Sequence, residues 1–412
     1  MGCPMHEQDA RWEAEFERWL GPFLGEFGHA GQRRWAPVYL RGLIAPGERK
    51  SVEPMARRQC PGDKEQLHHF VATSTWDTCA PHRVLLEKAE ALVGGDRSHL
   101  IIDDTALVKK GSHSVGVAHQ YCGQLGKSAN CQALVSLTLA RDEMPVPVAL
   151  SLYLPEAWAK DPVRRQRCKV PEELVFRPKW KIALDEVTRL VEAGVSFGDV
   201  LADAGYGSCA EFRQGLSALG LRWAVGISAD HHVYARSVRL RTVGTNAWTG
   251  KPRAKRAVTA KPRRVADVLA SLGPYALQSV TWRTGSKGAL RADFAALRVR
   301  VADAEPVFGV DGAVRHRHGP GDEVWLIFER RCNGETKYHL SNYPPDTPLE
   351  TLVAALKARW SCEQAHQQMK EELGLDHFEG RSWTGLHHHA LLTMIAFAFL
   401  QHLRKLENKA AA

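Results

Sequence analysis

Hydrophobic residues near the start of the chain recur at the spacing of an amphipathic helix. Trp12, Phe16, Trp19, Leu20 and Phe23 fall on one face of a helix with about 3.6 residues per turn. Arginine and lysine are frequent in the stretch that follows, residues 33–58. We therefore predict a helical N-terminal region over residues 1–95. Its basic stretch is equally consistent with a DNA-contacting surface and with a solvated basic face.

From Ser98 onward, short apolar runs alternate with polar turns. Leu100–Ile102 runs directly into two aspartates, and Val200–Ala202 runs into Asp203. Each run is typical of a short buried strand. Further strands are predicted at residues 115–121, 131–139, 146–154, 223–227, 324–328 and 338–340, and a helix is predicted at 180–193. An alternation of this kind predicts a mixed α/β fold.

Residues 230–322 interrupt that alternation with a basic, helix-poor segment. Strand-like stretches occur at residues 277–282 and 295–301, and no long helix is indicated. The basic residues near its start are Arg236, Arg239, Arg241, Lys251, Arg253, Lys255, Arg256, Lys261, Arg263 and Arg264, with Trp248 among them. The segment is interpreted as a β-rich insertion. It divides an α/β core into residues 96–229 and 323–385, and a C-terminal helix and tail follow at 386–412.

Composition narrows the class of partner and compartment. The 55 basic and 46 acidic residues give a formal net charge of +9, which favours a polyanionic partner such as nucleic acid. Nine scattered cysteines indicate a reducing compartment. The first residues lack the apolar segment of a signal peptide, and the longest apolar run, residues 390–400, is too short to span a bilayer. We expect a cytoplasmic protein with no membrane partner.

The most informative stretch is residues 352–373, which contain no proline or glycine and predict one helix. Arg359, Glu363 and Lys370 lie about one and two turns apart, so they share a face of that helix. A carboxylate between two cations could hold a metal ion while the cations bind phosphates. Taken alone, the same pattern also fits a solvated helix with an ordinary Arg–Glu pair.

Two upstream acids change that balance. Asp103 and Asp203 each follow a predicted strand, and the carboxyl ends of strands in one sheet are common places for functional groups to converge. Three clustered carboxylates suit Mg²⁺, and two such ions can activate a water or a 3′-hydroxyl for attack on a phosphodiester. Cys362 has no evident partner base in the sequence and is interpreted as an ordinary helix residue.

The order of motifs resembles the DDE transposases of bacterial insertion sequences, within the insertion sequence 4 superfamily and nearest to the family of insertion sequence 701. The resemblance covers roughly residues 28–385. The matching stretches are Leu100–Thr105, Lys109–Gly111, Ser114–Val117, Gln120–Tyr121, Asn130–Gln132, Tyr153–Trp158, Asp203–Tyr206 and the helix that carries Arg359, Glu363 and Lys370.

The resemblance implies a fold, a site and partners. The fold would be an RNase H-like catalytic core with a β-rich insertion and a helical N-terminal DNA-binding region. Asp103, Asp203 and Glu363 would be the catalytic, metal-binding triad, with two Mg²⁺ ions that Mn²⁺ can replace. Arg359 and Lys370 would contact DNA phosphates. The partners would be double-stranded DNA, at element ends and target site, and a second copy in a synaptic homodimer associated with the nucleoid.

Two positions depart from the pattern or leave it open. The superfamily has a tyrosine three residues before the arginine, and here that residue is Leu356. The Asp103–Asp104 doublet offers two candidate acids. The family order of acid, variable residue and threonine favours Asp103, and side-chain alternation lets only one of the pair face the metals.

We therefore predict a transposase that binds the terminal inverted repeats of its element, cleaves strands and joins a 3′-hydroxyl to target DNA. One alternative is a transposase-derived protein that only binds DNA, which would be expected to lack at least one acid. The other alternative is an RNase H-like nuclease without strand transfer.

Overall fold

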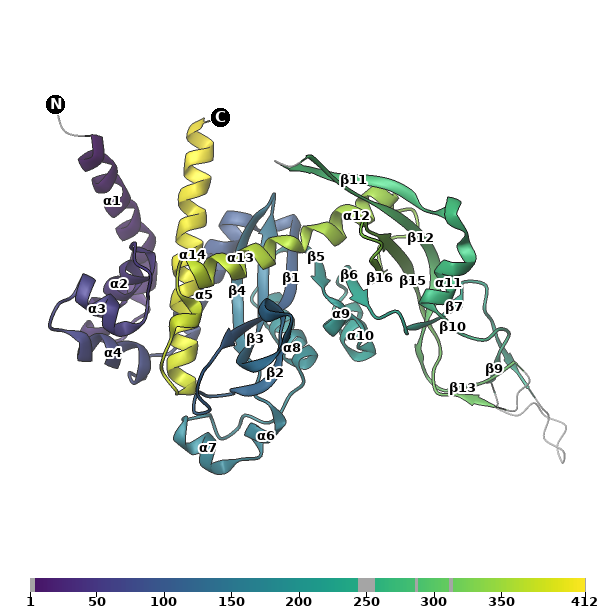
Figure 1. The fold of residues 1–412 in the computed structure, drawn as a ribbon, viewed down its shortest axis with the longest axis horizontal. Coiled ribbons are helices and arrows are strands. Elements are labelled where there is room, and N and C mark those ends of the chain that lie inside the picture. Colours follow the sequence, from purple (N-terminus) through teal and green to yellow (C-terminus); the bar gives the residue numbers. More distant parts are fainter. Residues whose placement is uncertain (1–3, 244–255, 286–287, 311–313, 412) are drawn as a thin grey trace. The chain divides into compact units, whose positions relative to one another are not determined.

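The computed structural model describes residues 4–243, 256–285, 288–310 and 314–411 (Figure 1). The chain divides into two compact units. The first unit comprises Met1–Gly198 and Trp360–Ala412, and the second comprises Asp199–Arg359. The predicted insertion residues Trp248, Lys251, Arg253 and Lys255 lie outside the described residues.

The N-terminal region of the first unit is helical, as predicted. Phe16, Trp19, Leu20 and Phe23 are buried, and Trp12 stacks on Phe16 with ring centroids 5.0 Å apart. The helices are α1 (Pro4–Gly25), α2 (Ala30–Ile44), α3 (Val52–Gln59), α4 (Lys64–Ala72) and α5 (Cys79–Val93). The apolar stripe read from the sequence is therefore the packing face of α1.

The described part of the first unit also contains four antiparallel strands, of which β3 (Lys127–Arg141) is the central one. β1 (Gly95–Val108) pairs with one edge of β3, and β4 (Met144–Leu152) and β2 (Ala118–Cys122) pair with successive parts of the other. The remaining short elements are η1 (Gly123–Leu125), α6 (Glu156–Ala159), α7 (Pro162–Arg167), α8 (Lys179–Glu192) and η3 (Leu375–His377). Every residue of β3 from Cys131 to Ala140 is buried, which makes this strand the centre of the sheet.

Two predicted strand boundaries were wrong. The strand that was expected to end at Ile102 continues to Val108, because its hydrogen-bond ladder with β3 runs on to the Val108–Cys131 pair. The acids therefore lie within β1 and not after it. The strand expected at 115–121 is confined to Ala118–Cys122, and Val115 is buried in a loop instead.

The C-terminal apolar run belongs to α14 (Trp383–Ala411), and its residues 388–399 are all buried. Burial on every side explains the run without a membrane. Among the described residues, no helix is long and apolar enough to cross a bilayer.

The second unit is rich in strands. β5 (Phe197–Ala202), in which the unit boundary falls, is parallel to β6 (Trp223–Ile227). The sheet continues antiparallel through β16 (Thr336–Ser341) and β15 (Gly319–Arg330) to β12 (Gly288–Ala304). β12 also pairs with β11 (Gln278–Gly285) and β7 (His232–Ala235), and β7 pairs with β10 (Arg263–Arg264). Four strands of the predicted insertion, β7, β10, β11 and β12, thus share one sheet with β15 and β16.

A smaller sheet and four helices complete the second unit. The small sheet has the order β14 (Arg315–His316), β13 (Val307–Phe308), β9 (Arg256–Val258) and β8 (Leu240–Thr242). The helices are α9 (Ala204–Gly207), α10 (Ala210–Ala218), α11 (Val265–Leu272) and α12 (Leu349–Ala358), beside a turn η2 (Pro274–Ala276). The mixed α/β class with a strand-rich segment is confirmed.

The single helix expected at 352–373 is two helices. α12 ends at Ala358, and α13 (Trp360–Glu371) begins two residues later. Arg359 between them retains helical dihedral angles, with φ −57° and ψ −27°. No proline or glycine marks this position, and the boundary between the two compact units falls directly after it. Helix propensity alone could not have located the break.

Candidate active site

Asp103 and Asp104 point to opposite faces of β1. Asp103 pairs with Ser136 on β3, and Asp104 pairs with Val135. Asp104 forms an ion pair with Lys179 at the start of α8. Because side chains alternate along a strand, Asp103 lies on the face away from α8.

α13 packs on the Asp103 side of the sheet. The Cys362 thiol lies 3.5 Å from Asp103 Oδ2. One turn later, His366 Nε2 lies 2.8 Å from the hydroxyl of Ser136, the cross-strand partner of Asp103. Two successive turns of α13 therefore rest on two neighbouring strands. Glu363, which follows Cys362, is exposed to solvent, so the structure brings Asp103 and the Glu363 turn together.

Lys370 occupies the other end of α13 and is nearly enclosed. Its side chain is 9% exposed, and Nζ donates to Gln124 Oε1 in η1 at 3.3 Å. Burial lowers the pKa of Lys370, and the negative charge of the nearby Asp376 carboxylate works against that shift. Lys370, which is predicted to contact a phosphate, is therefore a partly desolvated cation that donates to the Gln124 amide oxygen.

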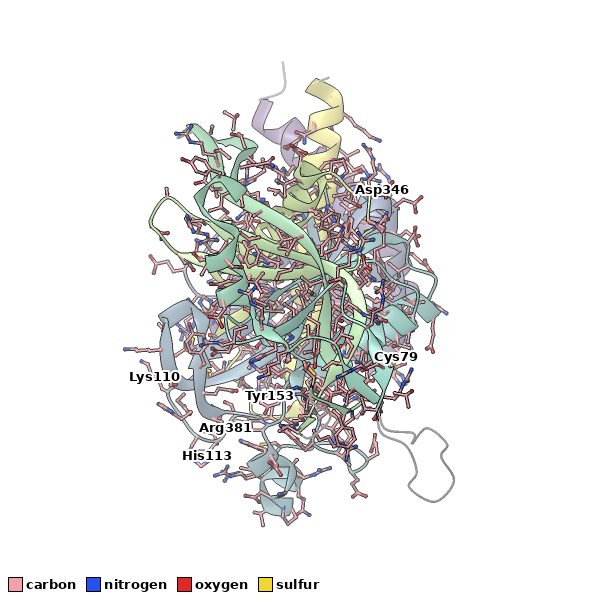
Figure 2. The ribbon with its side chains drawn as sticks, turned by 90° about the vertical axis from the view of Figure 1, so that its right-hand side faces the viewer. Cys79, Lys110, His113, Tyr153, Asp346 and Arg381 are labelled. Carbon is pink, nitrogen blue, oxygen red and sulfur yellow. The ribbon has the colours of Figure 1, made fainter. Side chains whose placement is uncertain are left out.

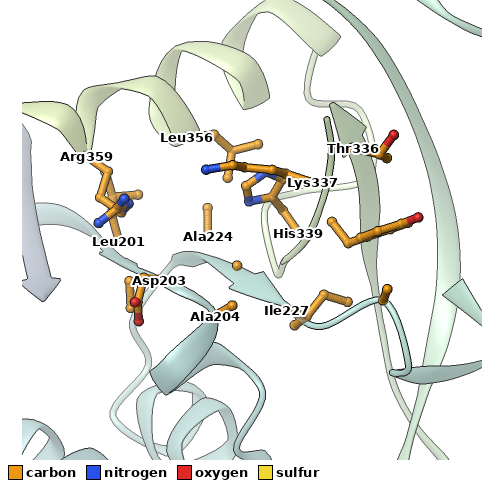
Figure 3. A pocket seen from close by; sticks show the side chains of 14 residues that line it. Leu201, Asp203, Ala204, Ala224, Ile227, Thr336, Lys337, His339, Leu356 and Arg359 are labelled. Atoms are coloured by element: carbon orange, nitrogen blue, oxygen red, sulfur yellow. The ribbon is translucent and has the colours of Figure 1, made fainter. Parts of the chain in front are cut away.

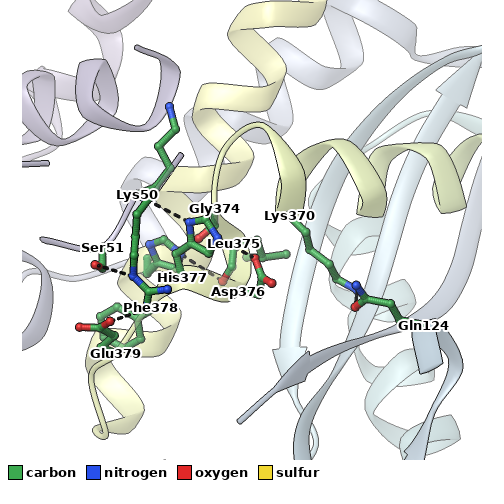
Figure 4. A network of polar contacts seen from close by, with 12 residues as sticks. Lys50, Ser51, Gln124, Lys370, Gly374, Leu375, Asp376, His377, Phe378 and Glu379 are labelled. Carbon is green, nitrogen blue, oxygen red and sulfur yellow. Dashed lines mark hydrogen bonds and ion pairs between the residues drawn. The ribbon is translucent and has the colours of Figure 1, made fainter. Parts of the chain in front are cut away.

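The loop after α13 is fastened by a network of polar contacts (Figure 4). Lys109 Nζ donates to the Phe378 carbonyl at 2.8 Å, and the backbone N–H of Lys50 donates to His377 Nδ1 at 3.0 Å. Arg49 forms an ion pair with Glu379. Burial lowers the pKa of Lys109. The end of β1 and the N-terminal helices therefore both fix the segment that leaves α13.

His389 on α14 completes this anchor. Tyr39 on α2 donates its hydroxyl to His389 Nδ1 at 2.9 Å, and His389 Nε2 donates to the carbonyls of Gly374 and Leu375 at 3.1 and 3.2 Å. Gly374 has φ +68°, and a Cβ there would come within 2.4 Å of Lys50 Cβ. This turn therefore requires glycine.

Several residues that carried the family resemblance hold the loop between β1 and β2. Asn130 Nδ2 donates to the carbonyls of Lys109 and Gly111 at 2.8 and 2.9 Å. Gln132 Nε2 donates to the Val115 carbonyl at 2.6 Å, and Trp158 Nε1 donates to the Val117 carbonyl at 2.7 Å. These residues belong to the stretches that carried the family resemblance, and in the structure their side chains hold the backbone between β1 and β2.

That loop places exposed basic groups beside the segment before α14. The Val115 N–H donates to the Arg381 carbonyl at 3.1 Å. Lys110, His113 and Arg381 are exposed, and Figure 2 shows them near one another on the ribbon. The first unit therefore carries a small cationic surface at this loop.

In the second unit, Asp203 caps the short helix α9. Its Oδ1 accepts the backbone N–H groups of Gly205 and Tyr206 at 2.9 and 3.3 Å. A Cβ on Gly207 would lie 2.1 Å from the Gly226 carbonyl of β6, so α9 can approach the strand only because that residue is glycine. The Asp-Ala-Gly-Tyr-Gly motif thus fixes the carboxylate at the end of β5.

Asp203 and Arg359 line one pocket of about 360 Å³ within the second unit (Figure 3). Leu356 lines it as well, at the position where the family resemblance leads us to expect a tyrosine. Lys337 and His339 on β16 also contribute to the wall. Sequence reasoning missed these two residues, because their place depends on the register between β6, β16 and β15.

A buried carboxylate lies next to His339, one of the β16 residues that line this pocket. Glu329 on β15 is 2% exposed and forms ion pairs with Lys357 and, at 2.9 Å, with Arg331. His339 Nε2 lies 3.6 Å from the same carboxylate. Burial by itself would raise the pKa of Glu329, but the nearby His339 ring and the hydrogen bonds from Lys357 and Arg331 hold it below the usual range.

The predicted metal ligands are oxygen donors, the type that Mg²⁺ prefers. Asp103 and Asp203 are partly accessible and Glu363 is exposed, so their chemistry fits hard divalent cations. Asp103 and Glu363 belong to the first unit, and Asp203 belongs to the second. Over the described ranges, no three His, Cys, Asp or Glu side chains form a group that could hold a metal ion.

Two protein-family profiles match the chain. The profile described as DDE superfamily endonuclease matches residues 22–289, and the one described as transposase DDE domain matches residues 181–399. Each match covers more than half of the chain. The chain therefore belongs to the DDE superfamily of endonucleases and transposases.

One curated relative agrees with this family. Over 193 residues the chain is 32% identical to a probable transposase for insertion sequence element IS701 from Microchaete diplosiphon. That match covers 47% of this chain and 48% of the relative, so the chain spans about half the length of that curated protein. A solved synaptic complex of piggyBac transposase with hairpin DNA is similar at a TM-score of 0.43 and 7% identity, covering 92% of this chain and 66% of that one.

Proposed function

We propose that this chain is a DNA transposase in which Asp103, Asp203 and Glu363 hold divalent cations, Mg²⁺ or in its place Mn²⁺. When bound, two such ions supply activation of a water or 3′-hydroxyl and stabilisation of the leaving oxygen. The observation that carries the proposal is the packing of α13 on β1. It holds the Glu363 turn against Asp103, whereas Asp104 pairs with Lys179 on the opposite face of β1.

The substrate we propose is double-stranded DNA, first at the terminal inverted repeats of the element and then at a target site. Arg359 lines the Asp203 pocket, where a guanidinium can bind the phosphate next to the cleaved bond. Lys370 would contact a second phosphate after leaving Gln124. A homodimer that holds two element ends would bring the two reacting DNA segments together.

Glu363→Gln tests this assignment with the least structural change. The amide preserves size but is a poor ligand for Mg²⁺, so strand cleavage should fall by about 10³-fold or more, while DNA affinity should stay within about threefold. Glu371→Gln is the matched control, because Glu371 is an exposed carboxylate on the same helix. Cleavage by Glu363→Gln at the rate of the control would refute the triad.

Two further outcomes separate the alternatives. A nuclease without strand transfer would cleave DNA but would fail to join a pre-cut 3′-hydroxyl end to target DNA. A transposase-derived binding protein would bind DNA and do neither. The proposal requires the wild-type chain to perform both reactions with Mg²⁺.

A further inference from the structure

The last turn of α12 has two sides with different neighbours. Leu356 and Arg359 line the pocket that contains Asp203, and Figure 3 shows both on the side of the helix that faces this aspartate. Lys357 is rotated by about 100° from Leu356 and by about 200° from Arg359, so its side chain leaves a different side of the helix. The turn that presents Arg359 can therefore be held in place through Lys357.

The Lys357 amine is enclosed by a carboxylate and two aromatic rings. Nζ lies 4.4 Å from the ring centroid of Trp282 on β11 and 5.5 Å from that of Phe294 on β12. The two rings meet edge to face, with their centroids 6.0 Å apart. Nζ also forms an ion pair with Glu329 on β15. Three strands therefore surround this one ammonium group, and contacts between a cation and aromatic faces strengthen where water is excluded.

Glu329 is the centre of this cluster. Its Oε1 accepts hydrogen bonds from Lys357 and, at 2.9 Å, from Arg331. Its Oε2 lies 3.6 Å from Nε2 of His339, a residue that lines the same pocket as Arg359. One buried carboxylate thus connects the sheet side of α12 with the β16 side of the pocket.

The place of the ion pair in the chain points to a role beyond stability. The side chains of Lys357 and Glu329 are 14% and 2% exposed, and a buried pair of this kind can often be replaced by apolar groups without loss of stability. The second unit ends at Arg359, two residues after Lys357. Helix ends fray unless they are held, and a group that binds a phosphate in a fixed geometry needs a rigid support.

We infer that Glu329 is a positioning residue for Arg359. Its ion pair with Lys357 fixes the last turn of α12 on the sheet, and the fixed turn directs the Arg359 guanidinium into the Asp203 pocket. Glu329 is too deeply buried to touch DNA, so its effect on the substrate passes through Arg359. The inference rests on the proposed function in taking Arg359 as a phosphate contact. Glu329 lies outside the stretches that carried the family resemblance.

A double-mutant cycle tests this transmission, with the affinity for a pre-cut DNA end measured without divalent metal. Glu329→Gln should weaken binding by about fivefold or more in the wild-type background. It should weaken binding by less than about twofold in the Arg359→Ala background, because residues that act through one another are not additive. Glu335→Gln is the matched control, since Glu335 is an exposed carboxylate that also pairs with Arg331, and its affinity should equal that of wild type.

A second variant separates positioning from folding. Glu329→Gln alone leaves a buried ammonium without its carboxylate, which destabilises the protein, whereas Glu329→Gln combined with Lys357→Met removes both charges and keeps the side-chain volume. This double variant should unfold in urea near the wild-type midpoint and still bind the pre-cut end about fivefold or more weakly. Wild-type affinity in the double variant would overturn the inference, as would an equal loss from Glu329→Gln with and without Arg359.

Failure of the proposed function would look different. A chain that shows the coupling between Glu329 and Arg359 but cleaves no DNA with Mg²⁺ would overturn the transposase activity and leave Glu329 as a positioning residue of a DNA-binding site. A chain that cleaves DNA while the two substitutions are additive would overturn only the role of Glu329.

Discussion

Cys362 donates its thiol hydrogen to Asp103 Oδ2 across 3.5 Å, and this contact joins α13 to β1. Cys362 is fully buried, so its thiol is shielded from water. The contact positions the Asp103 carboxylate and leaves Glu363, the next residue of α13, exposed to solvent. Whether an aspartate of β1 can act together with Glu363 therefore depends on the face of the strand on which its side chain lies.

The Asp103–Asp104 doublet therefore gives a sharp prediction. Asp103→Asn should abolish metal-dependent strand cleavage, because a neutral amide replaces a proposed ligand. Asp104→Asn should retain cleavage within about tenfold. It loses a partly exposed ion pair with Lys179, and pairs of this kind contribute about 0–1 kcal/mol to stability. Cleavage assays and urea unfolding of both variants provide the measurement. If Asp104→Asn were the inactive variant, the proposed ligand would be the wrong aspartate.

Lys370 and Gln124 give a second prediction. If Lys370 contacts a phosphate, Lys370→Ala should weaken DNA binding and lower the slope of log affinity against log salt by about one. Gln124→Ala removes the present partner of the amine, so it should leave affinity unchanged or raise it slightly. Binding measured over a series of salt concentrations distinguishes the two. An unchanged salt slope for Lys370→Ala would mean that the buried amine serves only to hold η1.

His389 makes stability depend on pH. Its hydrogen bonds require a neutral ring, and burial lowers its pKa to about 4 from the ordinary 6.5. Between those values the unfolded chain binds a proton that the folded chain excludes, so stability is lost as pH falls from 6.5 toward 4. At pH 5 the loss from this one group is about 2 kcal/mol.

Urea unfolding at pH 7 and pH 5 measures this effect. His389→Gln should be less stable than wild type at pH 7, because it disrupts the contacts to Tyr39 and Gly374. It should also lose less stability between pH 7 and pH 5. An equal loss in both proteins would show that other groups account for the pH dependence.

Local sequence patterns singled out the candidate acids but could not predict the contacts that position them. Apolar runs before Asp103 and Asp203 predicted strands because burial of such runs is a local signal. The two side chains of the doublet do lie on opposite faces, as alternation along any strand requires. The break at Arg359 carries no helix-breaking residue, and the place of His339 depends on pairing between distant strands. Such long-range register cannot be read from local patterns.

Leu356 provides the last prediction. It lines the pocket that also contains Asp203 and Arg359, at the position where the family resemblance leads us to expect a tyrosine. Leu356→Tyr would place a phenolic hydroxyl in this pocket, where it can donate to a DNA phosphate. The net gain of such a hydrogen bond is about 0.5–1.5 kcal/mol, so affinity for a pre-cut DNA end should rise by about 2- to 12-fold at fixed salt. Leu356→Phe supplies the ring without the hydroxyl and should bind like wild type. An equal gain for both variants would assign the effect to the ring, and no gain for Leu356→Tyr would mean that no phosphate comes within reach of this position.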